Sequence, residues 1–187
     1  MKWFIIILII LIIIGGLFVI NKNILNKNDE TKINNNGGEN ENKMEIKSIF
    51  KNGEKIPEKY TADGEDVNPS LEISSIPNNA RSLVLIIDDP DAPVGTWVHW
   101  VVWNIPANIN KIEENSIPEN SVQGKNSWNN NEYGGPSPPS GTHRYFFKLY
   151  ALDNTLSLDQ SADKKAVENA MKGHILAKTE LMGVYSR

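Results

Sequence analysis

Residues 135–152 read GPSPPSGTHRYFFKLYAL, a Pro- and Gly-rich turn that leads directly into an aromatic strand. Proline favours turns and is excluded from central strands, whereas Tyr and Phe are enriched in strands. Because successive strand residues point to opposite faces, His143 and Tyr145 share one face and Arg144 takes the other. The stretch therefore predicts a β-strand over residues 145–152 that begins with polar, chemically capable side chains.

Two further segments, residues 82–88 (SLVLIID) and 96–105 (TWVHWVVWNI), predict neighbouring core strands. The first is a short, mostly apolar run that ends at a Pro-rich turn, which is typical of a strand buried on both faces. The second is rich in Val and Trp and stops at Pro106. By strict alternation we expect His99 to share a face with three apolar residues, Trp97, Val101 and Trp103.

Weaker strand patterns lie at residues 46–49, 71–73 and 180–185. Residues 163–172 (DKKAVENAMK) place their apolar side chains on one helical face and precede Gly173, which suits the residue after a helix end. The whole pattern predicts a mainly β domain with one helix against its core.

Three short segments collect most of the reactive side chains: DDPDAP at 88–93, WVHW at 97–100 and GGPSPPSGTHRY at 134–145. A histidine on an apolar strand face is, taken alone, more often a satisfied core residue than a ligand. Here two of the three histidines of the chain fall in these segments, beside rigid turns and a carboxylate cluster. The coincidence favours a functional site.

Three kinds of site are compatible with these residues. Two histidines with carboxylates could hold a metal, although the spacing is not distinctive. A hydrolase would need an activated hydroxyl beside a histidine, and Ser137, Ser140 and Thr142 are near, but none stands in a G-x-S-x-G elbow. An anion pocket needs imidazole N–H groups, a Tyr hydroxyl and backbone N–H groups in a rigid frame, and all three are present.

The segments DPDAP (89–93), TWVHWVVWNIP (96–106) and GPSPPSGTHRYFFKLYAL (135–152) closely resemble the phosphatidylethanolamine-binding protein family, which includes the Raf-kinase inhibitor protein. Residues 173–187 resemble its prokaryotic branch. The resemblance implies a β-sandwich of antiparallel strands with small flanking helices. It also implies a pocket that accepts phosphate, acetate or a phosphoethanolamine head group, formed by Asp89, Asp91, His99, Gly135, Pro138, His143 and Tyr145.

Two residues are expected to support this pocket rather than touch the ligand. Arg144 should face away and pair with an aspartate of the 89–93 turn, because a planar guanidinium suits a bidentate carboxylate grip. Pro93 should shape the turn, with the Ala92–Pro93 bond as the best candidate for a cis peptide. The loop before the HRY motif departs from the animal members of the family, since residues 135–139 (GPSPP) replace a glycine-rich loop and proline supplies no N–H.

The N-terminal part differs sharply from the domain at residues 44–187. Residues 3–20 (WFIIILIILIIIGGLFVI) lack charges and suit a single membrane-spanning helix, so residues 1–20 are predicted to be an anchor rather than a cleaved signal peptide. Residues 21–43 are rich in Asn and predict a disordered linker. The flanking lysines hardly bias orientation, and a basic N-terminus before one apolar segment favours an extracytoplasmic domain at the cell membrane.

The chain carries a net charge of −4, which argues against nucleic acid as a partner. No motif implies a cofactor, and no metal set or activated nucleophile stands out, so we expect a binding protein rather than an enzyme. The predicted function is a membrane-tethered module that holds a small anionic or phosphorylated ligand. A hydrolase that uses a His–Asp pair, or an inhibitor of a protease or kinase acting on a protein partner, remain the alternatives.

Overall fold

The computed structural model describes residues 43–187. The predicted anchor at residues 1–20 and all but the last residue of the predicted linker at 21–43 lie outside the described residues. Within the described part, the α-helix has seven residues, and none of its helices is long and apolar enough for the roughly 20-residue span that a bilayer requires.

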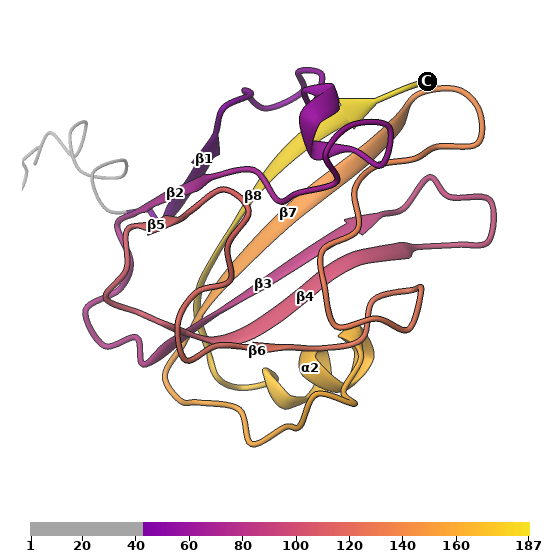
Figure 1. The fold of residues 1–187 in the computed structure, drawn as a ribbon. Helices are drawn as coiled ribbons and strands as arrows, with labels where there is room; N and C mark the ends of the chain where they lie inside the picture. Colours follow the sequence, from indigo (N-terminus) through magenta and orange to yellow (C-terminus); the bar gives the residue numbers. More distant parts are fainter. Residues whose placement is uncertain (1–42) are drawn as a thin grey trace, which may run out of the picture. The chain divides into compact units, whose positions relative to one another are not determined.

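Two antiparallel sheets form the domain (Figure 1). The smaller sheet has the order β1-β2-β5, with β1 at Glu45–Ser48, β2 at Leu71–Ser74 and β5 at Lys111–Ile112. The larger sheet has the order β6-β4-β3-β7-β8, with β6 at Val122–Gln123, β4 at Trp97–Pro106, β3 at Ser82–Asp89, β7 at His143–Leu152 and β8 at Ile175–Tyr185.

The central strand β3 of the larger sheet is buried on both faces. Between the sheets, side chains of β1, β2 and β5 pack on alternate residues of the central strands, among them Leu83, Leu85 and Phe147. On the opposite face, Val84 and Ile86 pack against the segment that carries the helix α2 (Lys164–Ala170). All eight residues of β3 are therefore buried, as the apolar run predicts.

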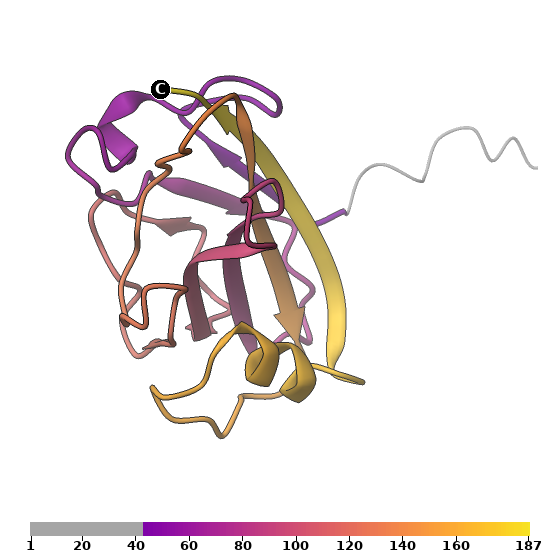
Figure 2. The ribbon, with the colours of Figure 1, turned by 90° about the vertical axis from the view of Figure 1, so that its right-hand side faces the viewer.

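The helix α2 and the short 3₁₀ helix η1 (Glu58–Tyr60) flank the sheets, and Figure 2 shows α2 at the opposite end of the molecule from η1 and the C-terminus. The Asp163 side chain caps α2 by accepting a hydrogen bond from the Ala166 N–H at 2.9 Å. Val167 and Met171 are buried against the sheet, which confirms the predicted helix and its apolar face.

The central strands agree with the sequence pattern, and the shorter elements agree less well. All six predicted strands are present, but β8 begins at Ile175, earlier than the predicted residue 180. The two-residue strands β5 and β6 were not anticipated. Elements of this length lack a periodicity that a sequence pattern could reveal, and they form because a neighbouring strand offers a free edge.

The predicted face of His99 is correct for Trp97, which lines the same pocket, but wrong for Val101 and Trp103, because a β-bulge interrupts β4. The register pairs Ile87 with Trp100 but Asp88 with Val98, so His99 is the extra residue of the longer strand. Trp100 then packs between the sheets, whereas Val101 and Trp103 pack on the α2 side. The bulge turns His99 towards Tyr145, with ring centroids 5.2 Å apart, and away from the α2-side core.

The predicted cis bond at Ala92–Pro93 is also wrong, because all peptide bonds among residues 43–187 are trans. The chain reversal between β3 and β4 is made by other means. The Asp89 side chain accepts a hydrogen bond from the Asp91 N–H at 2.8 Å, and Gly95 adopts a φ of 97°, which glycine tolerates without strain. These two local devices bend the loop without an isomerised bond.

Candidate functional site

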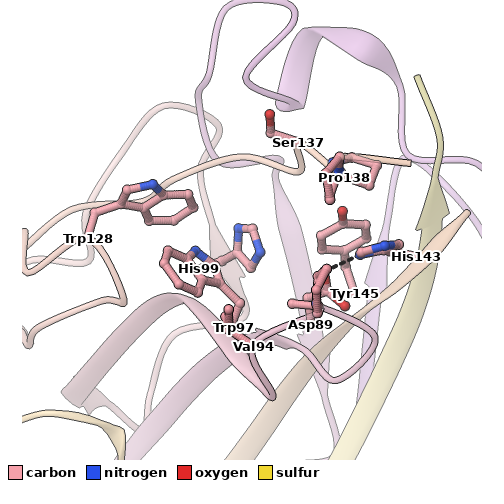
Figure 3. Close-up of a pocket in the computed structure, with 12 residues that line it drawn as sticks. Asp89, Val94, Trp97, His99, Trp128, Ser137, Pro138, His143 and Tyr145 are labelled. Carbon is pink, nitrogen blue, oxygen red and sulfur yellow. Dashed lines mark hydrogen bonds and ion pairs between the residues drawn. The ribbon is translucent and has the colours of Figure 1, made fainter. Parts of the chain in front are cut away.

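A pocket of about 380 Å³ opens where the ends of β3, β4 and β7 meet the loops that follow or precede them (Figure 3). The 89–94 turn, the start of β4, the start of β7 and the Pro-rich 137–139 segment form its walls. The lining residues are Asp89, Ala92, Pro93, Val94, Trp97, His99, Trp128, Ser137, Pro138, Pro139, His143 and Tyr145.

A histidine–aspartate pair lies at the polar end of the pocket. Nδ1 of His143 lies 2.7 Å from Oδ2 of Asp89, and both residues are buried. A carboxylate only accepts hydrogen bonds, so the His143 Nδ1 carries the proton, and Nε2 is the ring atom left for a ligand. A second proton, on Nε2, would make an imidazolium whose charge faces the Asp89 carboxylate.

Asp91 holds the turn behind this pair and does not line the pocket. Its carboxylate accepts hydrogen bonds from Arg144 N at 3.0 Å, Nε at 2.9 Å and Nη2 at 2.6 Å. The Arg144 guanidinium lowers the pKa of Asp91 to about 2. The predicted pairing of Arg144 with an aspartate of the turn is therefore present, whereas the expectation that Asp91 faces the ligand finds no support in its position.

His99 stands on the other side of the pocket and has a different partner. Its Nδ1 lies 2.6 Å from the carbonyl oxygen of Gly134, which can only accept, so Nδ1 must donate. Burial lowers the pKa of His99, and the Gly134 contact only partly opposes this. The ring is therefore neutral near pH 7, and its Nε2 offers a lone pair rather than a proton.

Tyr145 completes the polar end of the pocket. Its side chain is buried, and burial followed by the negative charge of Asp89 raises the pKa of its hydroxyl well above the usual range. The phenol therefore keeps its proton at physiological pH and can donate a hydrogen bond to an anion. The edge-to-face contact with His99 fixes the orientation of the tyrosine ring.

Gly135 lies outside the lining because its backbone is committed elsewhere. Its N–H donates to Oδ1 of Asp66 at 2.6 Å, and the Pro136 carbonyl accepts from the Ala62 N–H at 3.1 Å. A Cβ on Gly135 would lie 2.7 Å from the Thr61 Cα, so only glycine allows this approach. Gly135 thus anchors the Pro-rich loop to the 61–66 turn, and Pro138 carries that loop into the pocket wall.

Five of the seven predicted pocket residues come together, namely Asp89, His99, Pro138, His143 and Tyr145. Pro93, predicted as support, also lines the pocket. Sequence reasoning missed the apolar wall formed by Ala92, Val94, Trp97, Trp128 and Pro139, and it did not assign Ser137 to the pocket. A tryptophan in the Asn-rich 126–131 segment was the one available signal, since an aromatic residue in a polar loop has no core to join.

The structure does not arrange the four residues that could be metal ligands, Asp89, Asp91, His99 and His143, as a metal site. Asp91 is occupied by Arg144, and Nδ1 of each pocket histidine is bonded within the protein. Among residues 43–187, no group of three or more histidine, aspartate or glutamate side chains is arranged to hold a metal ion.

Comparisons with known proteins identify close relatives of the domain. A family model described as phosphatidylethanolamine-binding protein matches residues 46–186. A UPF0098 protein of Pyrococcus horikoshii is 46% identical over 159 residues, which cover 81% of this chain and 80% of that protein. A UPF0098 protein of Methanothermobacter thermautotrophicus is 48% identical over 150 residues, covering 77% of this chain and 99% of that protein.

Solved structures show the same fold. A Chlamydia trachomatis protein described as a homolog of phosphatidylethanolamine-binding protein matches with a TM-score of 0.76 and 40% identity, covering 79% of this chain and 99% of that one. E. coli YbcL, described as a new member of the mammalian family, matches with a TM-score of 0.73 and 28% identity, covering 78% of this chain and 99% of that one. The similarity therefore includes sequence as well as fold.

Proposed function

This chain belongs to the phosphatidylethanolamine-binding protein family, and from that premise we propose that its pocket binds the phosphate or carboxylate group of a small ligand. The observation that carries the proposal is the buried His143–Asp89 pair beside the Tyr145 hydroxyl at one end of the pocket. Both groups line the pocket, where a protonated Nε2 of His143 and the Tyr145 hydroxyl can donate hydrogen bonds to an entering anion.

The two histidines have different parts in the proposed complex. Binding of an anion at Nε2 of His143 favours a proton there, because the imidazolium is then held between the anion and Asp89. The neutral His99 offers an acceptor, which suits the O–H of a monoprotonated phosphate or an ordered water. Tyr145 donates to the anion without a change of charge.

The direct test is calorimetry of the full-length protein with inorganic phosphate and acetate. We expect binding of at least one of these anions with uptake of protons, which appears as a heat that depends on the ionisation enthalpy of the buffer. The variant His143→Asn keeps an N–H near the position of Nδ1 but removes Nε2, so it should lose most of the binding. Wild-type protein that binds neither anion would refute the proposal.

We also propose that residues 3–20 tether the domain to the cell membrane, with the domain on the extracytoplasmic side. The support is the uncharged, Ile-rich run and the polar segment that follows it. Full-length protein should stay with membranes after alkaline carbonate extraction, and a chain without residues 1–20 should be released. Protease added outside intact cells should cleave the domain. Release of the full-length protein, or protection from that protease, would contradict the tether or its orientation.

One observation favours a second function, hydrolysis. Ser137 lines the same pocket as the His143–Asp89 pair, so a hydroxyl, an imidazole and a carboxylate share one cavity. A hydrolase should turn over p-nitrophenyl phosphate or p-nitrophenyl acetate and lose that turnover in both Ser137→Ala and His143→Asn. Binding of phosphate without turnover of either ester favours the binding module.

A further inference from the structure

The pocket is much larger than an inorganic anion needs. A phosphate ion takes the place of only about three or four waters, each with a share of about 30 Å³, whereas the pocket encloses about 380 Å³. Asp89, His143 and Tyr145 lie together on one side of it, and His99 and Ser137 are the other polar residues of the lining (Figure 3). The other lining residues are mainly tryptophan, valine and proline, so a bare anion would leave most of the pocket surface without a contact.

Two of the most exposed large apolar side chains of the domain border this space. Trp128 is 44% exposed and Val94 is 79% exposed, and both line the pocket. Trp97 stands between them, with its ring edge-to-face with that of Trp128 at 5.3 Å. An apolar patch beside a polar pocket is the usual composition of a site for an organic ligand.

The loop that carries Trp128 is fixed from within. Asn126 is buried, and its Oδ1 accepts hydrogen bonds from the N–H groups of Trp128 at 3.0 Å and Asn130 at 2.9 Å. Its Nδ2 donates to the Glu132 carbonyl at 3.0 Å. Ser127 then binds the loop to β4, where its N–H donates to the Val98 carbonyl and its Oγ accepts from the Val98 N–H.

The indole of Trp128 is fixed as well. A Cβ added to Gly134 would lie 2.6 Å from the ring, so the indole lies directly on the glycine backbone. The His99 ring meets it edge-to-face at 5.3 Å. A rigid aromatic side chain that is held in place and yet half-exposed is preorganised for contact with a ligand, because little side-chain entropy remains to be lost on binding.

Resting on the proposed anion-binding function, we propose that Trp97 and Trp128 form a second subsite that takes a flat apolar substituent of the bound anion. The ligand class is then an aryl phosphate or aryl carboxylate. A cationic substituent fits less well, because Asp89 is the one acidic residue of the lining and both of its oxygens are used. Oδ2 contacts His143 and Oδ1 accepts from the Asp91 N–H.

Calorimetry of the full-length protein with inorganic phosphate, phenyl phosphate and phosphoethanolamine tests the subsite. We expect phenyl phosphate to bind about 3- to 10-fold more tightly than inorganic phosphate, the range of one or two aromatic contacts. Trp128→Ala should bring this ratio close to one, and Trp128→Phe should keep part of it. Ile175→Ala is the matched control, because Ile175 is also 44% exposed but lies outside the lining, and it should keep the full ratio.

The outcomes separate the two proposals. If wild-type protein binds no phosphate at all, the proposed anion site itself fails. If inorganic phosphate binds and phenyl phosphate gains nothing, or if its gain persists in Trp128→Ala, the anion site stands and the subsite is refuted. If phosphoethanolamine gains the advantage and Trp128→Ala removes it, the substituent class is cationic and the proposal is overturned.

Discussion

The two sides of the pocket each present a histidine, but the Nδ1 atoms of the two rings have different partners. On the β3–β7 side, Nδ1 of His143 donates to the Asp89 carboxylate at 2.7 Å. On the β4 side, Nδ1 of His99 donates to the Gly134 carbonyl at 2.6 Å. The two bonds are similar in length and burial, and the rings are chemically the same. They differ in the charge of the acceptor.

The charge of the acceptor matters because it decides how well a protonated ring is stabilised. A carboxylate favours an imidazolium on its partner, whereas a neutral carbonyl does little to offset the cost of burying a charge. The lowered pKa of His99 is the second case. We therefore expect the β3–β7 side to hold the anionic group and the β4 side, with Trp97 and Trp128, to hold the uncharged remainder of a ligand.

The largest effect is expected when each histidine is replaced by asparagine, which keeps a donor near the position of Nδ1 but removes Nε2. His143→Asn should weaken sulfate binding about 10- to 100-fold, the value of a charge-assisted hydrogen bond. His99→Asn should change it by less than about 3-fold, since a lone pair does not attract sulfate. Calorimetry measures both, and equal losses in the two variants would remove the distinction between the sides.

The pH dependence of sulfate affinity should come from the His143–Asp89 side of the pocket. Sulfate does not titrate between about pH 5 and 8, so its affinity reports the protein alone. Because an imidazolium attracts sulfate and a neutral imidazole does not, affinity should fall as pH rises. Asp89→Asn removes the carboxylate that accepts from the His143 ring and should reduce this pH dependence. A flat profile in the wild-type protein would show that the anion does not meet a titrating histidine.

The neutral His99 should affect the pH dependence of the free energy of unfolding rather than the affinity for sulfate. Burial lowers the pKa of His99 in the folded protein, so the unfolded chain binds the proton more readily. This contribution is fully present above about pH 6.5 and is lost as pH falls from there towards the folded-state pKa, by at most about 1.4 kcal/mol per pH unit. Urea unfolding of full-length wild type and His99→Asn at pH 7 and pH 5 should show a smaller acid loss in the variant. An equal loss would mean that His99 does not cause it.

The smallest effect concerns the support behind the charged side. Arg144→Lys replaces the planar grip on Asp91 with a single ammonium, so melting temperature should fall by about 1–3 °C. Sulfate affinity should change by less than about 2-fold, because neither residue lines the pocket. A variant that loses affinity while keeping its melting temperature would place Arg144 at the anion.

The sequence pattern predicted correctly those elements that have a long apolar run or a clear hydrophobic period. The apolar run of β3, the aromatic strand β7 and the apolar face of α2 were predictable because each repeats over several residues. Single extra residues have no such signal. The bulge at His99 placed Val101 and Trp103 on the opposite face from the histidine, because one added residue reverses the alternation of a strand.

The site shows the same limit. The polar motifs indicated Asp89, His143 and Tyr145, and the placement of Arg144 followed from alternation alone. The exclusion of Gly135 and Asp91 from the lining could not be foreseen. It depends on Asp66 and Arg144, partners that reach these residues from another turn or from the neighbouring strand. Trp128 was missed because its loop acquires its shape from the Asn126 hydrogen bonds rather than from periodicity.

The sequence by itself determined a mainly β domain, its three central strands with reactive side chains at their ends, and the family to which it belongs. These features depend on local patterns and on long motifs. Only the tertiary structure decided which ring nitrogen of each histidine holds the proton and which side chains surround the two rings. The partner of each Nδ1, a carboxylate from β3 or a carbonyl from the loop before Gly135, is brought there by the fold. Tautomer and charge are properties of such contacts between distant segments, and no single residue encodes them.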